Sequence, residues 1–251
     1  MMVRFGRALL AAVALAAATP ASAIVGGAED GGALARGTVM VLSSRGGVCS
    51  AVVIAPDVLA TAAHCVTDAP EHRAHFRDAA GGPVLIELAA KSVHPGFDAK
   101  AVARRRQSVD LALVRLASPL PDGFSPPPLT AAAPKLGETL RAGGYGLSVE
   151  GDQSGRSTGT FRTADLGVVE PYGPSRILVW LKPADGRVSG ACHGDSGGPL
   201  TAAGAVLALS TWTTGPKGRS CGMLTQGILL GPQKDWIDRT LTGWNRRARW
   251  N

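Results

Sequence analysis

Apolar residues in this chain occur in short runs that turn-forming residues interrupt. Within the runs they alternate with polar residues or stand side by side, and they rarely show the spacing of about 3.6 that an amphipathic helix requires. Turns rich in Gly, Pro and Asp, such as Ala80–Pro83 and Pro121–Gly123, separate the runs. Many short strands at such intervals are typical of β-sandwiches and β-barrels. We therefore predict an all-β chain with strands over Val48–Ala55, Val58–Ala62, Val84–Ala89, Leu111–Leu116, Ile177–Leu181 and Val206–Trp212.

One helix and one linker are predicted outside these strands. In Lys234–Leu241 the apolar side chains of Trp236, Ile237 and Leu241 can share one helical face. No other segment supports a helix prediction. Pro126–Pro128 lies near the middle of the chain and is the best linker candidate. We expect it to separate two structural units.

The first 23 residues have the composition of a secretory signal peptide. Arg4 and Arg7 precede an apolar run over Ala8–Ala18, and the small-residue cleavage motif Ala21–Ala23 follows. The run has eleven residues, too few for a membrane anchor, which needs about 20. We therefore predict cleavage after Ala23, no stable membrane insertion afterwards, and a secreted protein in the periplasm or the extracellular medium.

The chain is basic, with a net charge of +7 at pH 7. Removing residues 1–23 takes away two basic residues and no acidic ones, so the mature chain carries +5. Such an excess is compatible with anionic partners. The basic residues are scattered except at Arg104–Arg106 and Arg246–Arg249, and no nucleic-acid-binding signature accompanies them. We predict no nucleic-acid partner and expect these clusters to lie in a solvated loop and a frayed tail.

Four cysteines remain after cleavage. An even number of cysteines in an exported chain favours disulfides, and four allow three different pairings. No pair has the C-x-x-C spacing of a zinc site. We therefore predict no metal and no cofactor, and two disulfides among Cys49, Cys65, Cys192 and Cys221.

The motif that carries chemistry is Gly194–Gly198, in which Ser196 stands between Asp195 and two glycines. Flexible neighbours can expose a serine hydroxyl and let a backbone N–H approach a substrate oxygen. Such a motif alone is only a turn. His64 follows a predicted strand, however, and Asp110 opens another. A serine nucleophile needs a base such as histidine, and the histidine needs a carboxylate to orient it.

These motifs, in the order His64, Asp110 and Ser196, resemble those of the chymotrypsin/trypsin-like serine proteases. Further similar motifs are Ile24–Gly27 at the mature N-terminus, Gly144–Gly146, His94–Phe97 and Trp236–Ile237. The resemblance implies two six-stranded antiparallel Greek-key β-barrels packed together, with a C-terminal helix. It places His64 and Asp110 in an N-terminal barrel over residues 24–125, and Ser196 in a C-terminal barrel and helix over residues 126–251.

The resemblance also implies the roles of the site residues. Ser196 attacks the scissile carbonyl, His64 transfers the proton, and Asp110 orients His64. The N–H groups of Gly194 and Ser196 form the oxyanion hole. The implied disulfides are Cys49–Cys65, beside His64, and Cys192–Cys221, beside the serine loop.

Activation is implied to depend on Ile24. In the family a new N-terminal ammonium pairs with the residue before the nucleophile, here Asp195. Because the cleavage motif ends at Ala23, we expect export itself to free Ile24, with no zymogen stage. The alternative is cleavage elsewhere, followed by trimming by a second protease.

The family pattern places the floor of the primary specificity pocket at Gly190. A glycine offers no charge to an Arg or Lys side chain, so cleavage after these residues is disfavoured. Gly227 is expected to form one wall. If Trp212 matches the pocket tryptophan of the family, Thr213 forms another wall and P1 residues are small or medium and apolar. If Ser210 is instead the serine that precedes this tryptophan, the region is rearranged and this inference fails.

His193 precedes the oxyanion glycine and is expected on the pocket rim. With Lys217 and Arg219 it supports a second specificity, for acidic side chains. The remaining histidines are not predicted to act in the site. We expect His72 and His75 to lie in a solvated loop, and His94 of the His-Pro motif to be structural.

We therefore predict a secreted serine endopeptidase that works through an acyl-enzyme. Its expected partners are polypeptide substrates and a protein inhibitor, and it is expected to be a monomer. The alternative is a non-catalytic, basic, secreted binding protein on the same fold, since fold alone does not fix function.

Overall fold

The computed structural model describes residues 24–101, 103–104 and 106–251. The predicted signal peptide, residues 1–23, lies outside the described residues. No helix in the described part combines the length and the apolar character needed to cross a membrane.

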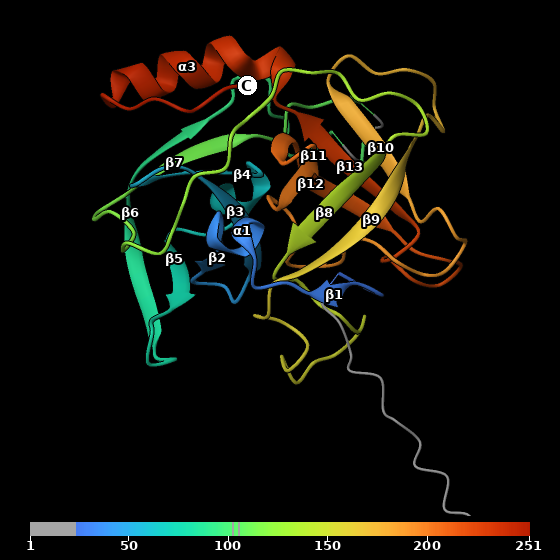
Figure 1. The fold of residues 1–251 in the computed structure, drawn as a ribbon, viewed down its shortest axis with the longest axis horizontal. Coiled ribbons are helices and arrows are strands. Elements are labelled where there is room, and N and C mark those ends of the chain that lie inside the picture. The colour runs from blue at the N-terminus through green and yellow to red at the C-terminus, as the bar shows by residue number, and fades with distance from the viewer. Residues whose placement is uncertain (1–23, 102, 105) are drawn as a thin grey trace, which may run out of the picture.

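The first half of the chain forms a closed antiparallel barrel (Figure 1). Its strand order is β2-β3-β4-β7-β6-β5. Alternate residues such as Val39, Val41, Ala51 and Val53 point inward and form one hydrophobic cluster. The strands are β2 (Thr38–Ser43), β3 (Val48–Ala55), β4 (Val58–Thr61), β5 (His72–Arg77), β6 (Pro83–Val93) and β7 (Ala112–Leu116).

The second half forms another six-stranded ring in the order β8-β9-β10-β13-β12-β11, which pairing between β8 and β9 closes. The short strand β1 (Ala28–Glu29) is added to β9. The ring strands are β8 (Thr139–Gly144), β9 (Arg162–Val169), β10 (Leu178–Lys182), β11 (Pro199–Ala202), β12 (Ala205–Thr214) and β13 (Leu224–Leu229). The two barrels confirm the predicted fold class.

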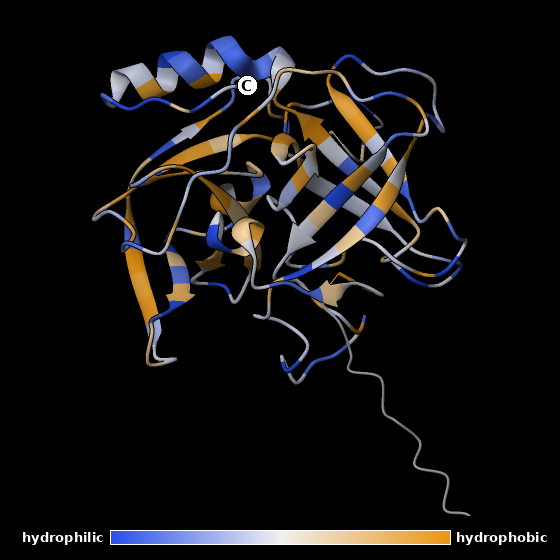
Figure 2. Ribbon diagram, in the orientation of Figure 1, coloured by the Kyte–Doolittle hydropathy of each residue, from blue (hydrophilic) through white to orange (hydrophobic). Residues whose placement is uncertain are grey.

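A separate hydrophobic cluster joins the two barrels to the C-terminal helix α3 (Lys234–Gly243). Figure 2 shows that apolar residues alternate with polar ones along the barrel strands. The cluster contains Leu113 from β7, Leu209 from β12, and Ile237 and Leu241 from α3. Burial of these side chains fixes the two barrels against each other.

Each predicted strand overlaps an observed one, and the predicted helix lies within α3. The prediction of a single helix was wrong, because α1 (Ala33–Arg36), α2 (His64–Thr67) and the 3₁₀ turn η1 (Gly231–Gln233) are also present. A single helical turn is too short to create a periodic pattern. The apolar pattern also missed β1, β2, β5, β8, β9, β11 and β13.

The predicted loop containing His72 and His75 is strand β5 instead. His72 is buried, and its Nε2 lies 2.7 Å from Asp68 Oδ1. Asp68 is therefore a structural partner and not merely a surface charge. The alternation was hidden because histidine occupies an inward position that precedes the buried Ala74.

The C-terminal tail is ordered, which corrects the expectation of a frayed end. Trp250 pairs with Leu129 in an isolated β-bridge, and its indole Nε1 donates to Asp238 Oδ1 at 2.9 Å. Arg246 binds the Asp57 carboxylate with two hydrogen bonds of 2.6 and 2.9 Å. Figure 1 shows the C-terminus lying close to α3.

Candidate active site

Strand pairing brings His64 and Asp110 together. β4 and β7 pair through Thr61 and Ala112, His64 begins α2 just after β4, and Asp110 lies just before β7. His64 Nδ1 is 2.6 Å from Asp110 Oδ2, and the His64 amide donates to Asp110 Oδ1 at 2.9 Å. The carboxylate therefore holds both the backbone and the ring, and it leaves Nε2 directed elsewhere.

The pKa of His64 is raised above its ordinary value. Burial acts to lower the pKa, but the hydrogen bond and charge of Asp110 raise it more, and the charge of Asp68 adds to this. The ring is thus prepared to carry a proton, because the adjacent carboxylate stabilises the imidazolium form.

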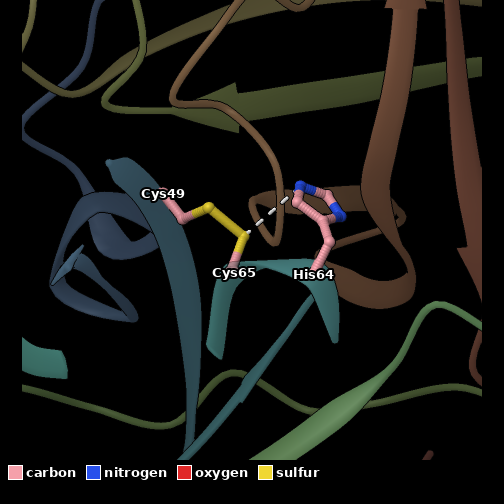
Figure 3. Close-up of side chains that lie close together, drawn as sticks. All are labelled: Cys49, His64 and Cys65. Carbon is pink, nitrogen blue, oxygen red and sulfur yellow. Dashed lines mark hydrogen bonds between the residues drawn. A yellow bond between two sulfur atoms is a disulfide. The ribbon is translucent and has the colours of Figure 1, made fainter. Parts of the chain in front are cut away.

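A disulfide lies directly beside the His64 ring. Cys49 in β3 is bonded to Cys65 in α2, and Cys65 Sγ lies 3.7 Å from His64 Nε2 (Figure 3). These three side chains resemble a metal-ligand cluster. The two sulfurs are already bonded to each other, so neither offers a thiolate to a metal.

Ser196 lies on a tight loop against the first barrel. Its carbonyl accepts a hydrogen bond of 2.8 Å from the Ser50 amide in β3. Gly197 follows at φ +81, and a Cβ there would lie 2.1 Å from the Ser50 carbonyl oxygen. Only glycine fits at this position. Both Ser196 and His64 are described, and no hydrogen bond joins Ser196 Oγ to His64 Nε2.

Two amides of this loop have no acceptor within the described residues. The N–H groups of Asp195, Gly197 and Gly198 all donate to backbone carbonyls of the protein. Those of Gly194 and Ser196 do not appear in any backbone hydrogen bond. Gly194 has φ +98, a conformation that L side chains rarely adopt. Two unoccupied N–H groups beside a serine hydroxyl are suited to binding a carbonyl oxygen.

Asp195 is completely buried beneath this loop. Its Oδ1 accepts from the Gly146 amide at 2.8 Å, and its Oδ2 accepts from the Cys192 amide at 2.9 Å. Burial raises the pKa of Asp195 to about 7. The Ile24 side chain is also buried, in the core of the second barrel. In the 251-residue chain its nitrogen is still an amide, so the Ile24–Asp195 ion pair stays a prediction.

The second disulfide, Cys192–Cys221, ties the serine loop to the region after β12. His193, next to Cys192, places its Nε2 3.0 Å from the hydroxyl of Ser220, next to Cys221. Ser220 in turn donates through its amide and hydroxyl to Glu150 Oε1 at 2.5 and 2.7 Å. The sequence pointed to His193 but not to Ser220 or Glu150, which lie far from it along the chain.

Two threonines narrow the space beside Gly190. Thr225 Oγ1 accepts from the Ala191 amide at 3.0 Å, and a Cβ on Gly190 would lie 3.0 Å from the same oxygen. Thr213 Oγ1 lies 2.8 Å from the Ala191 carbonyl oxygen and 3.1 Å from that of Leu224. Thr225 was missed by the sequence, which offered only a neighbouring glycine as a signal.

The expectation that Gly227 forms a pocket wall is corrected. A Cβ on Gly227 would lie 2.4 Å from Leu200 Cδ1 and 3.1 Å from the Leu209 carbonyl oxygen. Gly227 therefore faces the packed interior of the barrel. Thr225, two residues earlier on the same face of β13, lies beside Gly190 instead.

A bulge lies between Ser210 and Trp212, the two residues on which the alternative alignments depend. Ser210 pairs with Gly227 and Trp212 with Gln226, so Thr211 is an extra residue in β12. Such an insertion lets both flanking residues keep positions in the ladder. Thr213 hydrogen-bonds to the Ala191 carbonyl, and its place in the substrate pocket stays a prediction.

A large groove runs beside His64 and Asp110. Its volume is about 1090 Å³, and Tyr172, Trp180 and Trp212 line one side of it. The three rings form a chain of edge contacts, with centroid distances of 5.1 and 6.0 Å. An open aromatic surface next to His64 can hold an extended apolar segment.

Comparison with known proteins supplies relatives across most of the chain. The profile of the Trypsin family matches residues 24–237. Trypsin iota of Drosophila melanogaster is 26% identical over 204 residues, which cover 75% of this chain and 77% of that protein. Kallikrein-11 of Homo sapiens is 29% identical over 210 residues, which cover 77% of this chain and 72% of that protein.

Solved structures show the same fold. Neuropsin, a serine protease expressed in mouse brain, superimposes with a TM-score of 0.71 at 21% identity, over 86% of this chain and 99% of its own. Human heparin binding protein superimposes with a TM-score of 0.71 at 20% identity, over 91% of this chain and 100% of its own.

Proposed function

Because the chain belongs to the trypsin family of serine proteases, we propose that it hydrolyses peptide bonds with Ser196 as nucleophile, His64 as base and Asp110 as the group that orients the base. The observation that carries this proposal is the double hydrogen bond from His64 to Asp110. It fixes the imidazole in the tautomer that leaves Nε2 able to accept a proton.

The proposed reaction has two stages. Ser196 Oγ attacks the carbonyl carbon while His64 Nε2 takes its proton, and the amides of Gly194 and Ser196 bind the oxyanion. The C–N bond then breaks, and His64 protonates the leaving amine. In the second stage water attacks the acyl-enzyme, His64 again takes a proton, and Ser196 regains it as the acid is released.

The proposed P1 residue is small or medium-sized and apolar. Thr213 and Thr225 restrict the space above Gly190, and Gly190 itself carries no charge. A buried Arg or Lys side chain would lack a counter-charge there, which is costly. The second candidate preference is for acidic side chains, which His193 at the rim favours.

We also propose that residues 1–23 direct export and that cleavage before Ile24 creates the ammonium that pairs with Asp195. Intact mass of the secreted protein tests this, with residue 24 expected as the first residue. A different first residue would contradict direct processing. Two added residues before Ile24 should lower activity strongly.

One observation favours a second function without catalysis. The chain has the fold of human heparin binding protein, and its proposed mature form carries a charge of +5. A basic surface can bind polyanions without any chemistry at Ser196. This alternative differs from the first in a single measurable property, reactivity of Ser196.

The test uses mature protein, residues 24–251, and a fluorophosphonate that labels activated serines. Wild type should be labelled stoichiometrically, whereas Ser196→Ala and His64→Ala should not. Ser118→Ala is the matched control, because that exposed serine lies outside the proposed machinery. Folded wild type that stays unlabelled and cleaves no peptide in a library would favour the binding protein.

A further inference from the structure

An arginine occupies the inner face of the second barrel where the pattern calls for an apolar residue. Alternate residues of β9, namely Ala164, Leu166 and Val168, pack in the core around Ile24. Arg162 is the next residue on that face and is 6% exposed. Burial of a guanidinium is costly unless charge and hydrogen bonds compensate it.

The guanidinium is only partly satisfied. Its Nη2 donates to Glu29 Oε1 at 2.7 Å, while Nε and Nη1 are buried without a partner in the described structure. Glu29 is largely exposed and belongs to β1, the strand that follows the proposed new N-terminus. Arg162 therefore has unused donors on the side away from Glu29.

Strand register directs this side chain toward Asp195. Arg162 pairs directly with Gly144 of β8, and directly paired residues of antiparallel strands project to the same face. A Cβ on Gly144 would lie 2.2 Å from Asp195 Oδ1. The Arg162 side chain thus leaves the sheet on the face where the Asp195 carboxylate is buried, and its charge acts on that carboxylate.

Other charged groups do not neutralise Asp195 within the described chain. Gly144 and Gly146 have no side chain, Cys192 is in a disulfide, and burial raises the pKa of Tyr145 to about 12, so its phenol stays neutral. Before processing, Glu29, Arg162 and the ionised form of Asp195 together carry one net negative charge. The ammonium of a freed Ile24 would balance it.

We propose that Arg162 is a positioning residue that keeps the buried Asp195 carboxylate charged and thereby holds the Gly194 and Ser196 amides in their substrate-binding orientation. This rests on the catalytic role proposed above for those amides. Arg162 shares the task with the Ile24 ammonium and, through Glu29, ties the N-terminal strand to the serine loop.

The first test compares Arg162→Gln, Arg162→Lys and Glu29→Gln in mature protein. Arg162→Gln removes the counter-charge, so kcat should fall about tenfold, and the acid limb of kcat should move to higher pH because Asp195 protonates more readily. Arg162→Lys should restore most of the loss. Glu29→Gln should move the limb to lower pH, because Arg162 then acts on Asp195 without an opposing anion.

Acid limbs that move in opposite directions in Arg162→Gln and Glu29→Gln distinguish a positioning role of Arg162 from a merely structural one. A structural role would impair both variants alike. Arg141→Gln is the control, since Arg141 lies in β8 and forms an exposed pair with Asp165. Equal pH profiles of kcat for Arg162→Gln and Arg141→Gln would overturn the proposal. Acid limbs of Arg162→Gln and Glu29→Gln that move in the same direction would overturn it as well.

A second measurement does not depend on catalysis. In Ser196→Ala protein, the Asp195 carboxyl carbon can be followed by NMR as pH is varied. Its titration should move to higher pH in Arg162→Gln and to lower pH in Glu29→Gln. Absence of these shifts would refute the role of Arg162. If the shifts appear but the protein with Ser196 intact cleaves no peptide, only the proposed function is refuted.

Discussion

His193 Nε2 lies 3.0 Å from Ser220 Oγ, and this contact bridges the two loops that the Cys192–Cys221 disulfide joins. Because the single hydroxyl hydrogen of Ser220 is directed to Glu150, Ser220 Oγ must accept from His193. In this arrangement His193 Nε2 is the donor to Ser220 Oγ. The Glu150 carboxylate and the Ser220 hydroxyl thus hold the imidazole of His193, next to Gly194, in one orientation.

Substitution of Glu150 by alanine should loosen this arrangement. Two hydrogen bonds are lost, each contributing about 0.5–1.5 kcal/mol. We expect KM for peptides to rise several-fold while kcat changes little, because the nucleophile and base are untouched. Steady-state kinetics measure this, with the exposed Glu71→Ala as control. An unchanged KM would show that the contact does not affect substrate binding.

Replacing Asp110 with asparagine should lower kcat by about 10⁴-fold without unfolding the protein. Activity requires neutral His64, so wild-type activity is lost as pH falls through the raised pKa of His64. Without the Asp110 charge that pKa drops, and the acid limb of residual kcat/KM should move to lower pH. Asp68→Asn, which removes a weaker charge, should give a smaller shift in the same direction. Identical limbs in wild type and Asp110→Asn would contradict the assignment.

Thr225→Gly should enlarge the proposed substrate pocket. Removal of a side chain beside Gly190 should raise cleavage after Leu or Phe relative to Ala, by about tenfold or more, as measured with a peptide library. Thr225→Val is the matched control. It preserves the volume, so the P1 profile should not change, but the Ala191 amide loses its acceptor and the free energy of unfolding should fall by about 1–3 kcal/mol. A P1 profile unaffected by Thr225→Gly would place the pocket elsewhere.

The Arg246–Asp57 pair should contribute to stability. Its side chains are 38% and 11% exposed, so solvent weakens the pair only in part. We expect Arg246→Met to lower the free energy of unfolding, measured as a lower midpoint in urea denaturation. Arg247 is exposed and forms no ion pair in the described structure, so Arg247→Met should have no effect. Equal stability of the two variants would mean that the tail is held by Trp250 alone.

The apolar pattern predicted an all-β chain, and the resemblance to the serine proteases supplied the two barrels and the candidates His64, Asp110 and Ser196. Period-two runs of apolar residues indicate strands in either barrel, and the glycines around Ser196 are required by close backbone contacts. His72 was misplaced because its inward position carries a titratable ring, which breaks the apolar alternation.

Contacts between segments that are distant in the sequence could not be predicted, because a local pattern does not encode them. Thr225 of β13 meets Ala191, which is 34 residues earlier in the chain and beside Gly190. Arg162 has a detectable signal, an arginine that ends an alternating apolar stripe, but its meaning depends on Gly144 of the neighbouring strand. The ordered tail depends in the same way on Leu129, more than a hundred residues earlier.

The Cys49–Cys65 bond has a consequence for where the enzyme can work safely. A reducing cytosol keeps cysteines as thiols. A Cys65 thiol at its present position, 3.7 Å from His64 Nε2, would offer a hydrogen-bond donor to the nitrogen that is proposed to take the serine proton. Oxidation removes that donor and clamps α2 to β3. The disulfide thus keeps the side of His64 that faces Cys65 free of a competing donor, and an oxidising compartment preserves it.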